Sequence, residues 1–405
     1  MTEKQGKNQG DLQKLNRSLV MRLIHKQNVC SRTTLARETG LTKASITGIT
    51  QQLINAGVVK EVGLIDGSMG RRSIGLTLEK EKYLCIGVRL TRRSTQCGLF
   101  NLAGELHAVS EEKLFPHATP QDAIQTLKTQ IGALLHRSNG RQVLGIGIAL
   151  PGPIICDEDK VVYMSAFPGW EHVSLRQELS DTFHLPVLLE HDGVCYAMSE
   201  WWNLGPDDGK LMLCVLVGQG VGAGIVQNGI PIRGAMGCAG EIGHMTLNPM
   251  GPRCDCGNRG CLENYCSTLA LERDMALALD ADPSHPRHGS HPSHSEIFEM
   301  VRQGDVTATT LFVQAAQYLA YGLVNVINFL NPDVVVVTDE MAELEELLEK
   351  TLMEILQDRL AQEILKRTRL VIKPGGRYQA IQSATTLIID QFLYQPFVSD
   401  MKEFL

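Results

Sequence analysis

Aromatic residues and long apolar runs are scarce in this sequence. Phe, Trp and Tyr make up 5% of the 405 residues, and no uninterrupted stretch approaches the roughly 20 apolar residues that a membrane-spanning helix needs. The N-terminal stretch, MTEKQGKNQGDLQK, is polar and lacks the apolar run of a signal peptide. These absences predict a cytoplasmic protein. The hydrophobic share of 43% is ordinary, and with this length it predicts a sizeable core and two or three domains.

Disulfide bonds are not expected, although cysteine itself is not scarce. The chain has 11 cysteines, an odd number, and most of them stand singly among apolar residues, as Cys85, Cys195 and Cys214 do. This pattern differs from the cysteine spacing of a small secreted disulfide framework and predicts reduced thiols.

Acidic charge is scarce only near the N-terminus. Residues 1–80 contain 13 Lys and Arg against 6 Asp and Glu, a net charge of +7, whereas the rest of the chain carries −14. A basic segment in front of an acidic body suggests that the segment meets a polyanion.

Three helices are predicted in the basic segment. The first is indicated by apolar residues at helical spacing: Leu15, Leu19, Leu23 and Ile24. The second is predicted between a Ser31 cap and a stop at Gly40, and the third begins after a Thr42 cap. Two helices joined by so short a turn are typical of a helix-turn-helix.

The third helix has the side chains that DNA recognition needs. Its apolar residues Ile46, Ile49 and Leu53 fall on one face. Short polar, basic or small residues are left at its start: Lys43, Ala44, Ser45 and Thr47. Bulky groups there would hold the helix away from base edges, so this start is suited to the major groove.

A wing is predicted after the third helix. The segment VVKEVGLIDGSMGRRSIGLTL reads as two strands around a Gly-rich tip, where Arg71 and Arg72 are placed to reach phosphates or the minor groove. Residues 1–80 are therefore interpreted as a winged helix-turn-helix DNA-binding domain. The alternative is a small helical protein-interaction domain with a solvated basic face.

The rest of the chain, residues 81–405, alternates between strand and helix patterns. Short apolar runs such as VLGIGIALPGPI and KLMLCVLVGQGVGAGIVQNG predict strands, and 120–137 and 308–329 predict helices. We expect an α/β body in two similar lobes, about 81–190 and 191–380, with a C-terminal helix returning to the first lobe. A ligand cleft is expected between the lobes.

Polar residues at predicted element ends are candidates for ligand binding. His191 and Asp192 end the strand in LLEHDG, and Asp192 is a candidate base or acceptor for a sugar hydroxyl, with a helix N-cap as its alternative role. Glu241 and His244 lie three residues apart in GEIGHM, and Glu263 follows a cysteine cluster. Together these side chains would suit a polyhydroxylated ligand.

Four alternating glycines form a second candidate site. Gly218, Gly220, Gly222 and Gly224 in VGQGVGAGI would allow close backbone approach, and their N–H groups are suited to phosphate. A glycine-rich hairpin turn explains the same pattern.

The segment HMTLNPMGPRCDCGNRGC predicts a metal site. His244, Cys254, Cys256 and Cys261 offer an imidazole and three thiolates, the ligand number and softness that tetrahedral zinc prefers. Because four protein ligands close the coordination sphere, a structural zinc is predicted. Unligated thiols and a disulfide are the alternatives, and a Cys-X-Cys disulfide would be strained.

The longer segment GEIGHMTLNPMGPRCDCGNRGCLE resembles the signature of the ROK family of repressors, open reading frames and kinases. The resemblance covers nearly the whole chain, and the winged helix in front points to regulators of the NagC/XylR or Mlc type. It implies a two-lobed actin-like, sugar-kinase-like body of ribonuclease H-like topology. It also implies that Asp192, Glu241, His244 and Glu263 contact sugar hydroxyls.

The kinase motifs of the family are incompletely matched. Asp192 matches the catalytic base, preceded by His191 where Asn is usual. The first phosphate motif reads IGVRLT, with Arg89 and without its Asp, and Gln219 replaces a Thr in the second. The adenosine motif, commonly Gly-Gly, reads TDEM, so that Asp339 and Glu340 bring negative charge to the nucleotide position.

The sequence therefore predicts a regulator with a relic kinase body, not an enzyme. We expect a repressor of sugar uptake or metabolism genes that binds double-stranded operator DNA as a homodimer or homotetramer. A sugar or sugar phosphate, or a partner such as a sugar transporter subunit, would control it. The alternative is an ATP-dependent sugar kinase, for a hexose or an amino sugar, with an appended DNA-binding domain.

Overall fold

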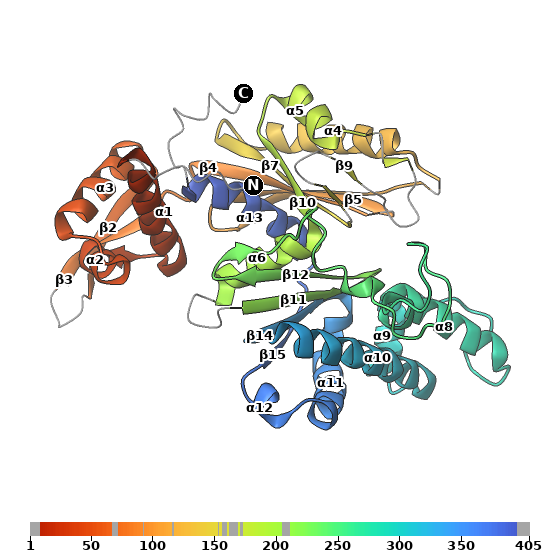
Figure 1. Ribbon diagram of the computed structural model, residues 1–405. Helices are drawn as coiled ribbons and strands as arrows, with labels where there is room; N and C mark the ends of the chain where they lie inside the picture. Colours follow the sequence, from red (N-terminus) through yellow and green to blue (C-terminus); the bar gives the residue numbers. More distant parts are fainter. Residues whose placement is uncertain are drawn as a thin grey trace. The chain divides into compact units, whose positions relative to one another are not determined.

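The computed structural model shows an N-terminal helical region followed by two β-sheets, each packed against helices (Figure 1). It describes residues 9–66, 72–91, 93–115, 117–152, 154–155, 160–161, 169–170, 173–204 and 211–394. Chain contacts divide it into two compact units. The first unit contains residues 1–148, 174–189 and 384–405, and the second contains 149–173 and 190–383.

The N-terminal region has the predicted helices and wing strands. The helices are α1 (Gln9–Gln27), α2 (Arg32–Thr39) and α3 (Lys43–Asn55). The strands β2 (Val59–Asp66) and β3 (Arg72–Leu78) pair antiparallel, and the short β1 (Cys30–Ser31), which the sequence pattern did not indicate, joins the far edge of β3.

Both predicted helix caps are present. The Ser31 side chain accepts a hydrogen bond from the Thr34 backbone N–H at 3.1 Å, and the Thr42 side chain accepts one from Ser45 N–H at 3.1 Å. Each cap satisfies a backbone donor that has no partner in the first helical turn. The caps fix where α2 and α3 begin, and α2 ends before Gly40 as predicted.

The buried face of α1 differs from the predicted one. Val20, Met21 and Ile24 are fully buried, whereas Leu19 is 42% exposed. At about 100° per residue, Leu15, Leu19 and Leu23 lie about 180°, 140° and 100° away from Ile24 around the helix axis, so they do not share its buried face. The helix was correctly predicted, but the spacing did not identify its inner face.

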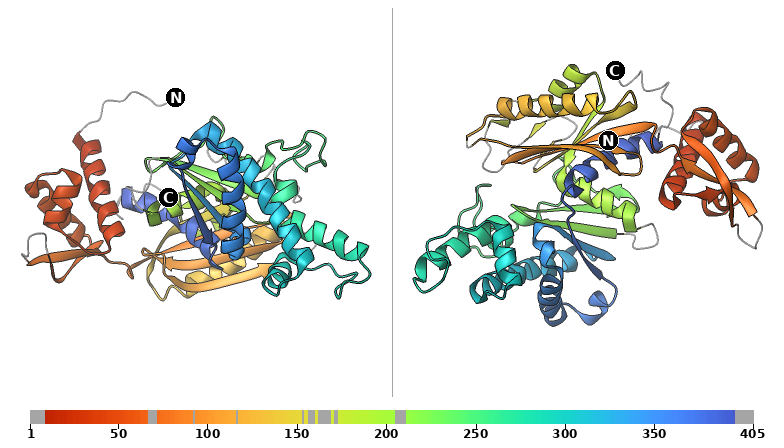
Figure 2. Two further views of the ribbon diagram at one scale, coloured as in Figure 1. Left: turned by 90° about the horizontal axis from the view of Figure 1, so that it is seen from below. Right: turned by 180° about the vertical axis from the view of Figure 1, so that it is seen from behind.

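The first of the two large β-sheets has the strand order β10-β7-β4-β5-β6. Its strands are β4 (Tyr83–Leu90), β5 (Ser94–Asn101), β6 (Leu106–Lys113), β7 (Gln142–Leu150) and β10 (Val187–His191). Successive strands β4, β5 and β6 pair antiparallel. Its helices are α4 (Pro120–His136), α5 (Leu175–Phe183) and the C-terminal part of α13 (Gln379–Tyr394). The right view of Figure 2 shows α4 on one face of this sheet and α13 on the other.

The second sheet has the strand order β13-β12-β11-β14-β15. Its strands are β11 (Leu211–Val217), β12 (Val221–Gln227), β13 (Ile230–Pro231), β14 (Val334–Asp339) and β15 (Arg369–Pro374). The two sheets share one strand order. When the strands of each sheet are numbered along the chain, they lie side by side in the order 3-2-1-4-5. This repeated order is the expected architecture of two similar lobes.

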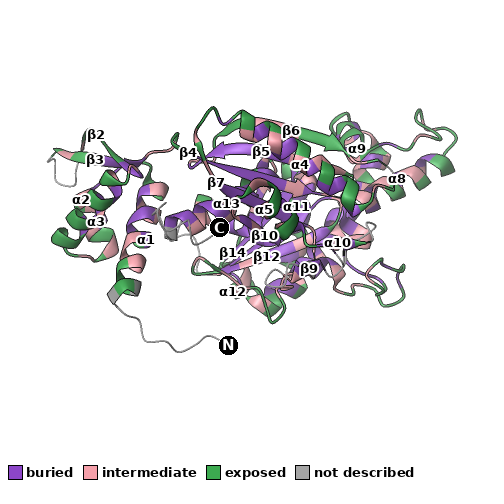
Figure 3. Ribbon diagram, turned by 90° about the horizontal axis from the view of Figure 1, so that it is seen from above, coloured by how far each residue is buried: buried purple, intermediate pink, exposed green. Residues whose placement is uncertain are grey.

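Helices cover both faces of the second sheet. Leu213, Val215 and Val217 of β11 pack with α10 (Val306–Leu330) and α11 (Glu345–Arg359), whereas Met212, Cys214 and Leu216 pack with α6 (Asp192–Leu204). Alternate residues of a strand point to opposite faces, which is why a continuous apolar run is needed here. Figure 3 shows buried residues along the strands and exposed residues on α2 and α3.

Short elements complete the described part of the chain. They are β8 (Ile154–Ile155), β9 (Lys160–Val161), α7 (Glu263–Cys266), α8 (Thr268–Ala281), α9 (His294–Arg302), α12 (Gln362–Leu365) and the 3-10 helices Ile242–His244 and Glu340–Leu344. In this part α10 alone is long and apolar enough to cross a membrane, but half of its most apolar window is buried against the protein, as in a core helix.

Candidate functional site

His191 and Asp192 lie where β10 meets α6. β10 ends at His191 and α6 begins at Asp192. The Gly193 backbone N–H donates to Asp192 Oδ1 at 2.7 Å and lies 3.2 Å from His191 Nδ1, so the start of the helix orients both side chains. Beneath them the buried Glu190 carboxylate accepts a hydrogen bond from Arg233 Nε at 2.8 Å.

Glu241 and His244 come from a segment that hydrogen-bonds to the edge of β12. The Ala223 backbone N–H donates to Gly240 O at 2.9 Å, and a 3-10 helix over Ile242–His244 turns both side chains inward. His191 Nε2 lies 3.5 Å from Glu241 Oε1 and 3.6 Å from Asp192 Oδ1. Residues that are distant in sequence therefore meet in one group.

Glu263 completes this group from the first residue of α7. Its Oε1 lies 3.4 Å from His244 Nδ1, and His244 Nε2 lies 3.9 Å from Glu241 Oε2. We call His191, Asp192, Glu241, His244 and Glu263 the polar pocket. The structure thus brings together all five residues that the sequence singled out as ligand contacts.

Glycines keep side chains away from the polar pocket. A Cβ atom on Gly152 would meet the His191 ring and lie 3.2 Å from Glu241 Oε1, and one on Gly222 would lie 3.6 Å from His191 Cε1. Glu241 Oε1 is buried and receives no hydrogen bond from the described residues. Burial raises the pKa of Glu241, an effect that the nearby histidines oppose. The pocket thus offers one buried carboxylate oxygen without a hydrogen-bond donor in the described part of the chain, which a ligand hydroxyl would satisfy.

The predicted cysteine cage is assembled beside the pocket. The ligand atoms of His244, Cys254, Cys256 and Cys261 all lie within 4.8 Å of one another. Cys256 Sγ lies 3.6 Å from Cys261 Sγ, and Cys254 Sγ lies 3.7 Å from His244 Nδ1. Tetrahedral zinc with bonds of about 2.3 Å to sulfur and about 2.0 Å to nitrogen places neighbouring ligand atoms roughly 3.5 to 3.8 Å apart. The donor set therefore fits a metal ion of this kind.

The loop around the cage is held by its own backbone. Leu247 N–H donates to Gly260 O at 2.8 Å, Leu262 N–H donates to Met245 O at 3.0 Å, and Gly257 N–H donates to Cys254 O at 3.0 Å. Gly257 and Gly260 have φ angles of 91° and 64°, which L side chains rarely adopt. The ten cysteines of the described residues are free thiols, so the cage is not cross-linked.

The four alternating glycines do not form one surface. Gly218 and Gly220 lie in the turn between β11 and β12, which we call the glycine turn (residues 218–220). Gly222 faces the polar pocket. A Cβ on Gly224 would collide with the backbone of Gly193 at the start of α6, so Gly224 allows this helix to pack closely on β12.

Carboxylates lie against the glycine turn. A Cβ on Gly218 would lie 2.6 Å from Asp339 Oδ2 and 3.4 Å from Glu340 Oε2. Glu340 Oε2 accepts the Thr268 hydroxyl at 2.6 Å, and Thr268 N–H donates to Gly218 O at 2.8 Å. The turn is therefore joined to α8 and to the end of β14.

Asp339 has an unusual backbone conformation. Its φ of 76° and ψ of −157° fall in a region that is essentially restricted to glycine and costs of order 1–3 kcal/mol for other residues. Its side chain is buried. The surrounding packing must therefore hold an aspartate where a glycine would be relaxed.

His294 lies near Glu340. Its Nδ1 lies 3.0 Å from Glu272 Oε1 and its Nε2 lies 3.9 Å from Glu340 Oε1. Burial lowers the pKa of His294, but the hydrogen bond with Glu272 and the charge of Glu340 outweigh it and raise the pKa overall. Sequence reasoning missed this contact because α8, α9 and the end of β14 meet only in the fold.

The candidate DNA-binding residues are placed on the outside of α3 and β3. Lys43, Ala44, Ser45 and Thr47 are exposed, and Thr47 Oγ1 donates to Lys43 O at 2.9 Å. Arg72 is exposed at the start of β3, whereas Arg71 lies outside the described residues. Arg89 is half-buried within β4.

Comparison with known proteins places this arrangement among regulators and kinases. A protein-family model described as "ROK family" matches residues 85–390. The DNA-binding transcriptional dual regulator NagC of Escherichia coli K12 is 31% identical over 339 residues, 83% of each chain. The xylose repressor of Bacillus subtilis 168 is 25% identical over 388 residues, 94% of this chain and 97% of that one.

Solved structures agree with these relatives. A ROK family transcriptional regulator described as a homologue of the E. coli Mlc protein has a TM-score of 0.79 at 26% identity, covering 95% of this chain and 97% of that one. A ROK family glucokinase from Streptomyces griseus, solved with glucose and AMPPNP, has a TM-score of 0.68 at 24% identity, covering 75% of this chain and 98% of that one. The kinase likeness concerns the fold alone.

Proposed function

The chain belongs to the ROK family, and its relatives are sugar-related DNA-binding regulators; we propose that it represses sugar uptake or metabolism genes. In this proposal the N-terminal region binds operator DNA and a sugar-type ligand in the polar pocket controls that binding. The observation that carries the proposal is the start of α3, where a capped helix exposes short polar and basic side chains in front of a kinase-like body.

We assign base contacts to Lys43, Ala44, Ser45 and Thr47, and phosphate contacts to Arg71 and Arg72. The short side chains at the start of α3 would let its backbone approach the major groove closely. Two copies of the chain would read the two halves of an operator, as a homodimer or within a homotetramer. A cytoplasmic location is part of this proposal.

We assign sugar contacts to the polar pocket. The carboxylates of Asp192, Glu241 and Glu263 are acceptors for ligand hydroxyls, and the unpaired Glu241 oxygen favours a donor-rich ligand. The names of the relatives suggest N-acetylglucosamine or xylose derivatives as the first ligands to test. A sugar phosphate, or a protein partner such as a transporter subunit, is a further candidate effector.

We assign a structural zinc ion to the cage. His244 would bind it through Nδ1, leaving Nε2 directed toward Glu241, so that one imidazole joins the metal to the polar pocket. When bound, the ion would order the loop that places Glu241 and Glu263.

We propose that the body does not turn over ATP. Asp339 and Glu340 would place carboxylates beside the triphosphate at the glycine turn, and two negative groups at this distance repel. The competing proposal is a sugar kinase, favoured by Asp192 at the helix start, in the place of the family's catalytic base. ATP turnover against a panel of hexoses and amino sugars, lost in Asp192→Asn, would favour the kinase over the regulator.

DNA selection tests the regulator directly. Random duplexes are selected with the purified chain and with its Lys43→Gln, Ser45→Ala and Lys26→Gln variants. We expect the α3 variants to change the selected bases or weaken specific binding by about 1–3 kcal/mol per lost base contact. Lys26→Gln removes the same charge from an exposed position in the last turn of α1 and should leave the preferred sequence unchanged.

Two results of this selection would contradict the proposal. One is that the wild-type chain selects no DNA sequence, even at low salt. The other is a set of α3 variants that select the wild-type sequence with wild-type affinity, which would return the N-terminal region to a protein-interaction role.

A further inference from the structure

A cavity in the second unit has no role in the proposed function. Its volume is about 440 Å³, within the roughly 300–1,000 Å³ of small-molecule sites. Its walls come from the loop around the cage, from α7, from α8 and from α10, and they include Tyr265 and Tyr318. We call this cavity the tyrosine pocket. None of the five residues of the polar pocket lines it, so it is a separate cavity.

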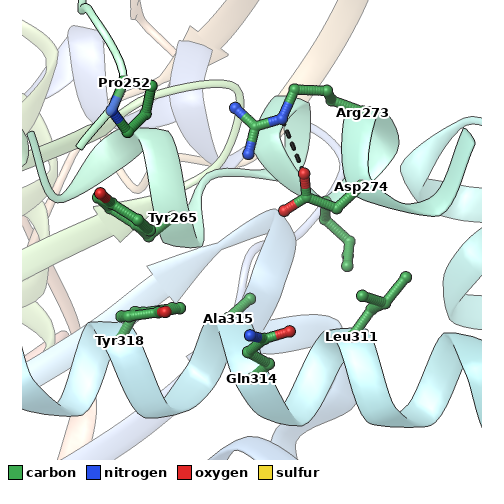
Figure 4. Close-up of a pocket in the computed structure, with 9 residues that line it drawn as sticks. Pro252, Tyr265, Arg273, Asp274, Leu311, Gln314, Ala315 and Tyr318 are labelled. Carbon is green, nitrogen blue, oxygen red and sulfur yellow. Dashed lines mark hydrogen bonds and ion pairs between the residues drawn. The ribbon is translucent and has the colours of Figure 1, made fainter. Parts of the chain in front are cut away.

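One end of the tyrosine pocket is aromatic. Figure 4 shows Tyr265 and Tyr318 at this end, below Pro252. Their ring centres lie 4.7 Å apart and their planes are tilted by 42°. The Tyr265 hydroxyl is buried against Gly251, where an added Cβ would collide with it. A ligand therefore reaches the ring of Tyr265 and not its hydroxyl.

The floor of the tyrosine pocket is uncharged and continuous with the core. Ala315 of α10 and Leu271 of α8 are buried in the apolar cluster that includes β11, and Leu311 packs against the same cluster. None of the 25 residues of α10 is Asp, Glu, Lys or Arg. Because core side chains are closely packed, this floor is formed before any ligand arrives.

The charges at the other end of the pocket neutralise each other. Arg273 Nε lies 2.8 Å from Asp274 Oδ1, and Arg273 Nη2 donates to Asn264 O at 3.0 Å. The lining residues therefore offer no unpaired positive charge to an anionic ligand such as a nucleotide or a sugar phosphate.

Two polar groups at this end remain available to a ligand. Asp274 Oδ2 and the side-chain amide of Gln314 have no hydrogen bond to other described residues. Figure 4 shows both groups facing the cavity, beside Leu311. A carboxylate only accepts hydrogen bonds, whereas an amide both donates and accepts. The ligand must therefore supply a donor for Asp274.

The two ends together select a class of ligand. Aromatic rings that stack on tyrosine gain more than their buried area alone provides. A purely apolar ring would cover Asp274 and Gln314 without forming a hydrogen bond, which costs binding energy. We infer that the tyrosine pocket binds an uncharged aromatic molecule with a hydroxyl or N–H group, its ring against Tyr265 and Tyr318 and its donor on Asp274.

The tyrosine pocket shares supporting segments with the polar pocket. Tyr265 follows Glu263 by two residues in α7, and Pro252 precedes Cys254 by two residues in the loop around the cage. A ligand held against Tyr265 and Pro252 would restrict the motion of both segments. The inference goes beyond the proposed function, because it gives the body a second ligand of different chemistry from a sugar.

Titration with 7-hydroxycoumarin tests the ligand class. This probe has two fused rings and one hydroxyl, which stays protonated at mildly acidic pH. 7-Methoxycoumarin has the same rings without the donor. Isothermal titration of the full chain should show the hydroxyl compound binding at least about fivefold more tightly, because the methoxy compound leaves the Asp274 carboxylate unpaired. Asp274→Ala should make the two affinities equal.

Filling the pocket tests its location. Gln314 is exposed, so Gln314→Trp places a large ring in the pocket without removing a packed side chain, and it should abolish binding of 7-hydroxycoumarin. Asn325→Trp is the matched control, because Asn325 is an exposed residue of α10 that does not line the pocket. This variant should bind as the wild type does, and both variants should unfold at the wild-type temperature.

Hydrogen exchange tests the effect on the loop. In the wild-type chain, 7-hydroxycoumarin should slow amide exchange in residues 245–262, and in Gln314→Trp it should not. Unchanged exchange in the wild-type chain with the probe bound would overturn the link between the two pockets.

Three results would overturn the site itself. They are a wild-type chain that binds neither coumarin, equal binding of the two coumarins by the wild-type chain, and a Gln314→Trp chain that binds 7-hydroxycoumarin normally. Selection of operator DNA does not depend on these titrations, so their failure is distinguishable from failure of the proposed function.

Discussion

The polar pocket and the glycine turn lie in the same unit, yet their polar groups are satisfied differently. In the polar pocket, Gly152 and Gly222 keep space free, and a buried oxygen of Glu241 receives no hydrogen bond from the described residues. At the glycine turn, Asp339 and Glu340 lie against Gly218, and Glu340 holds the Thr268 hydroxyl. The first region has a buried acceptor without a hydrogen-bond donor in the described part of the chain, whereas the carboxylate of Glu340 in the second is hydrogen-bonded within the protein.

In the proposed function, this difference is what would let a kinase-like body serve as a sensor. A binding site must leave donors or acceptors unpaired, at a cost in stability that its ligand removes. In this proposal the polar pocket carries that cost, whereas Glu340, Thr268 and Gly218 at the glycine turn are joined by hydrogen bonds within the protein. Ligand control then requires only that the sugar bind one state of the chain better than the other.

Removing the metal should have the largest effect on the polar pocket. Cys256→Ser or chelation should destabilise the loop around the cage by several kcal/mol, because the zinc ion proposed for the cage would add order beyond the backbone hydrogen bonds of the loop. The loss should abolish sugar-induced stabilisation, measured as a shift in unfolding temperature, since Glu241 and Glu263 flank the loop.

Cys238→Ser is the control for metal removal. Cys238 is also partly exposed but lies outside the cage, so this variant should keep both the metal and the sugar response. Elemental analysis that found no stoichiometric zinc in the wild-type chain would contradict the assignment of the cage.

Substitutions at the two glycines of β12 should have the next largest effects, and these effects should differ from each other. Gly224→Ala should cost about 1–3 kcal/mol in the free energy of unfolding, because its Cβ collides with the Gly193 backbone and α6 must move. Gly222→Ala meets only ordinary contacts, 3.6 Å from His191 Cε1, and should fold normally but narrow the polar pocket. Denaturant unfolding and sugar titration separate the two effects. Equal destabilisation by both substitutions would contradict the different roles assigned to these glycines.

Much of this architecture follows from the sequence, because its signals are local. The caps at Ser31 and Thr42 fixed the starts of α2 and α3, and apolar runs predicted β7, β11 and β12. The cage could be predicted because its three cysteines fall within eight residues, and His244 lies only ten residues before Cys254. The fold and the family were both correctly predicted.

Features that depend on distant contacts could not be predicted. The inner face of α1 depends on what packs against it, and β1 is defined only by its pairing with β3. The four glycines share one sequence pattern, yet Gly224 packs against α6 while Gly218 faces Asp339, because Gly224 lies within β12 and Gly218 lies in the turn before it.

Substitutions that remove one negative charge test which region binds the sugar. Glu241→Gln should weaken sugar binding about tenfold to a hundredfold, since hydrogen bonds to a charged group contribute roughly 1.5–3 kcal/mol. Glu340→Gln makes the same change at the glycine turn and should leave sugar affinity unchanged. Isothermal titration of both variants checks this. A larger loss in Glu340→Gln would place the sugar at the glycine turn instead.

Relaxing Asp339 should have the smallest effect and the opposite sign. Asp339→Gly removes strain of about 1–3 kcal/mol and loses up to about 1 kcal/mol to chain entropy, so we expect a net gain of about 1 kcal/mol in the free energy of unfolding. Asp333→Gly is the control, because Asp333 accepts a hydrogen bond from Leu211 N–H at 2.9 Å without such strain and should lose stability. If Asp339→Gly is destabilised as well, the contacts of this carboxylate outweigh its strain. The glycine turn would then be held closed by Asp339 itself, and the difference between the two regions would be an active feature of the regulator and not the remnant of a lost site.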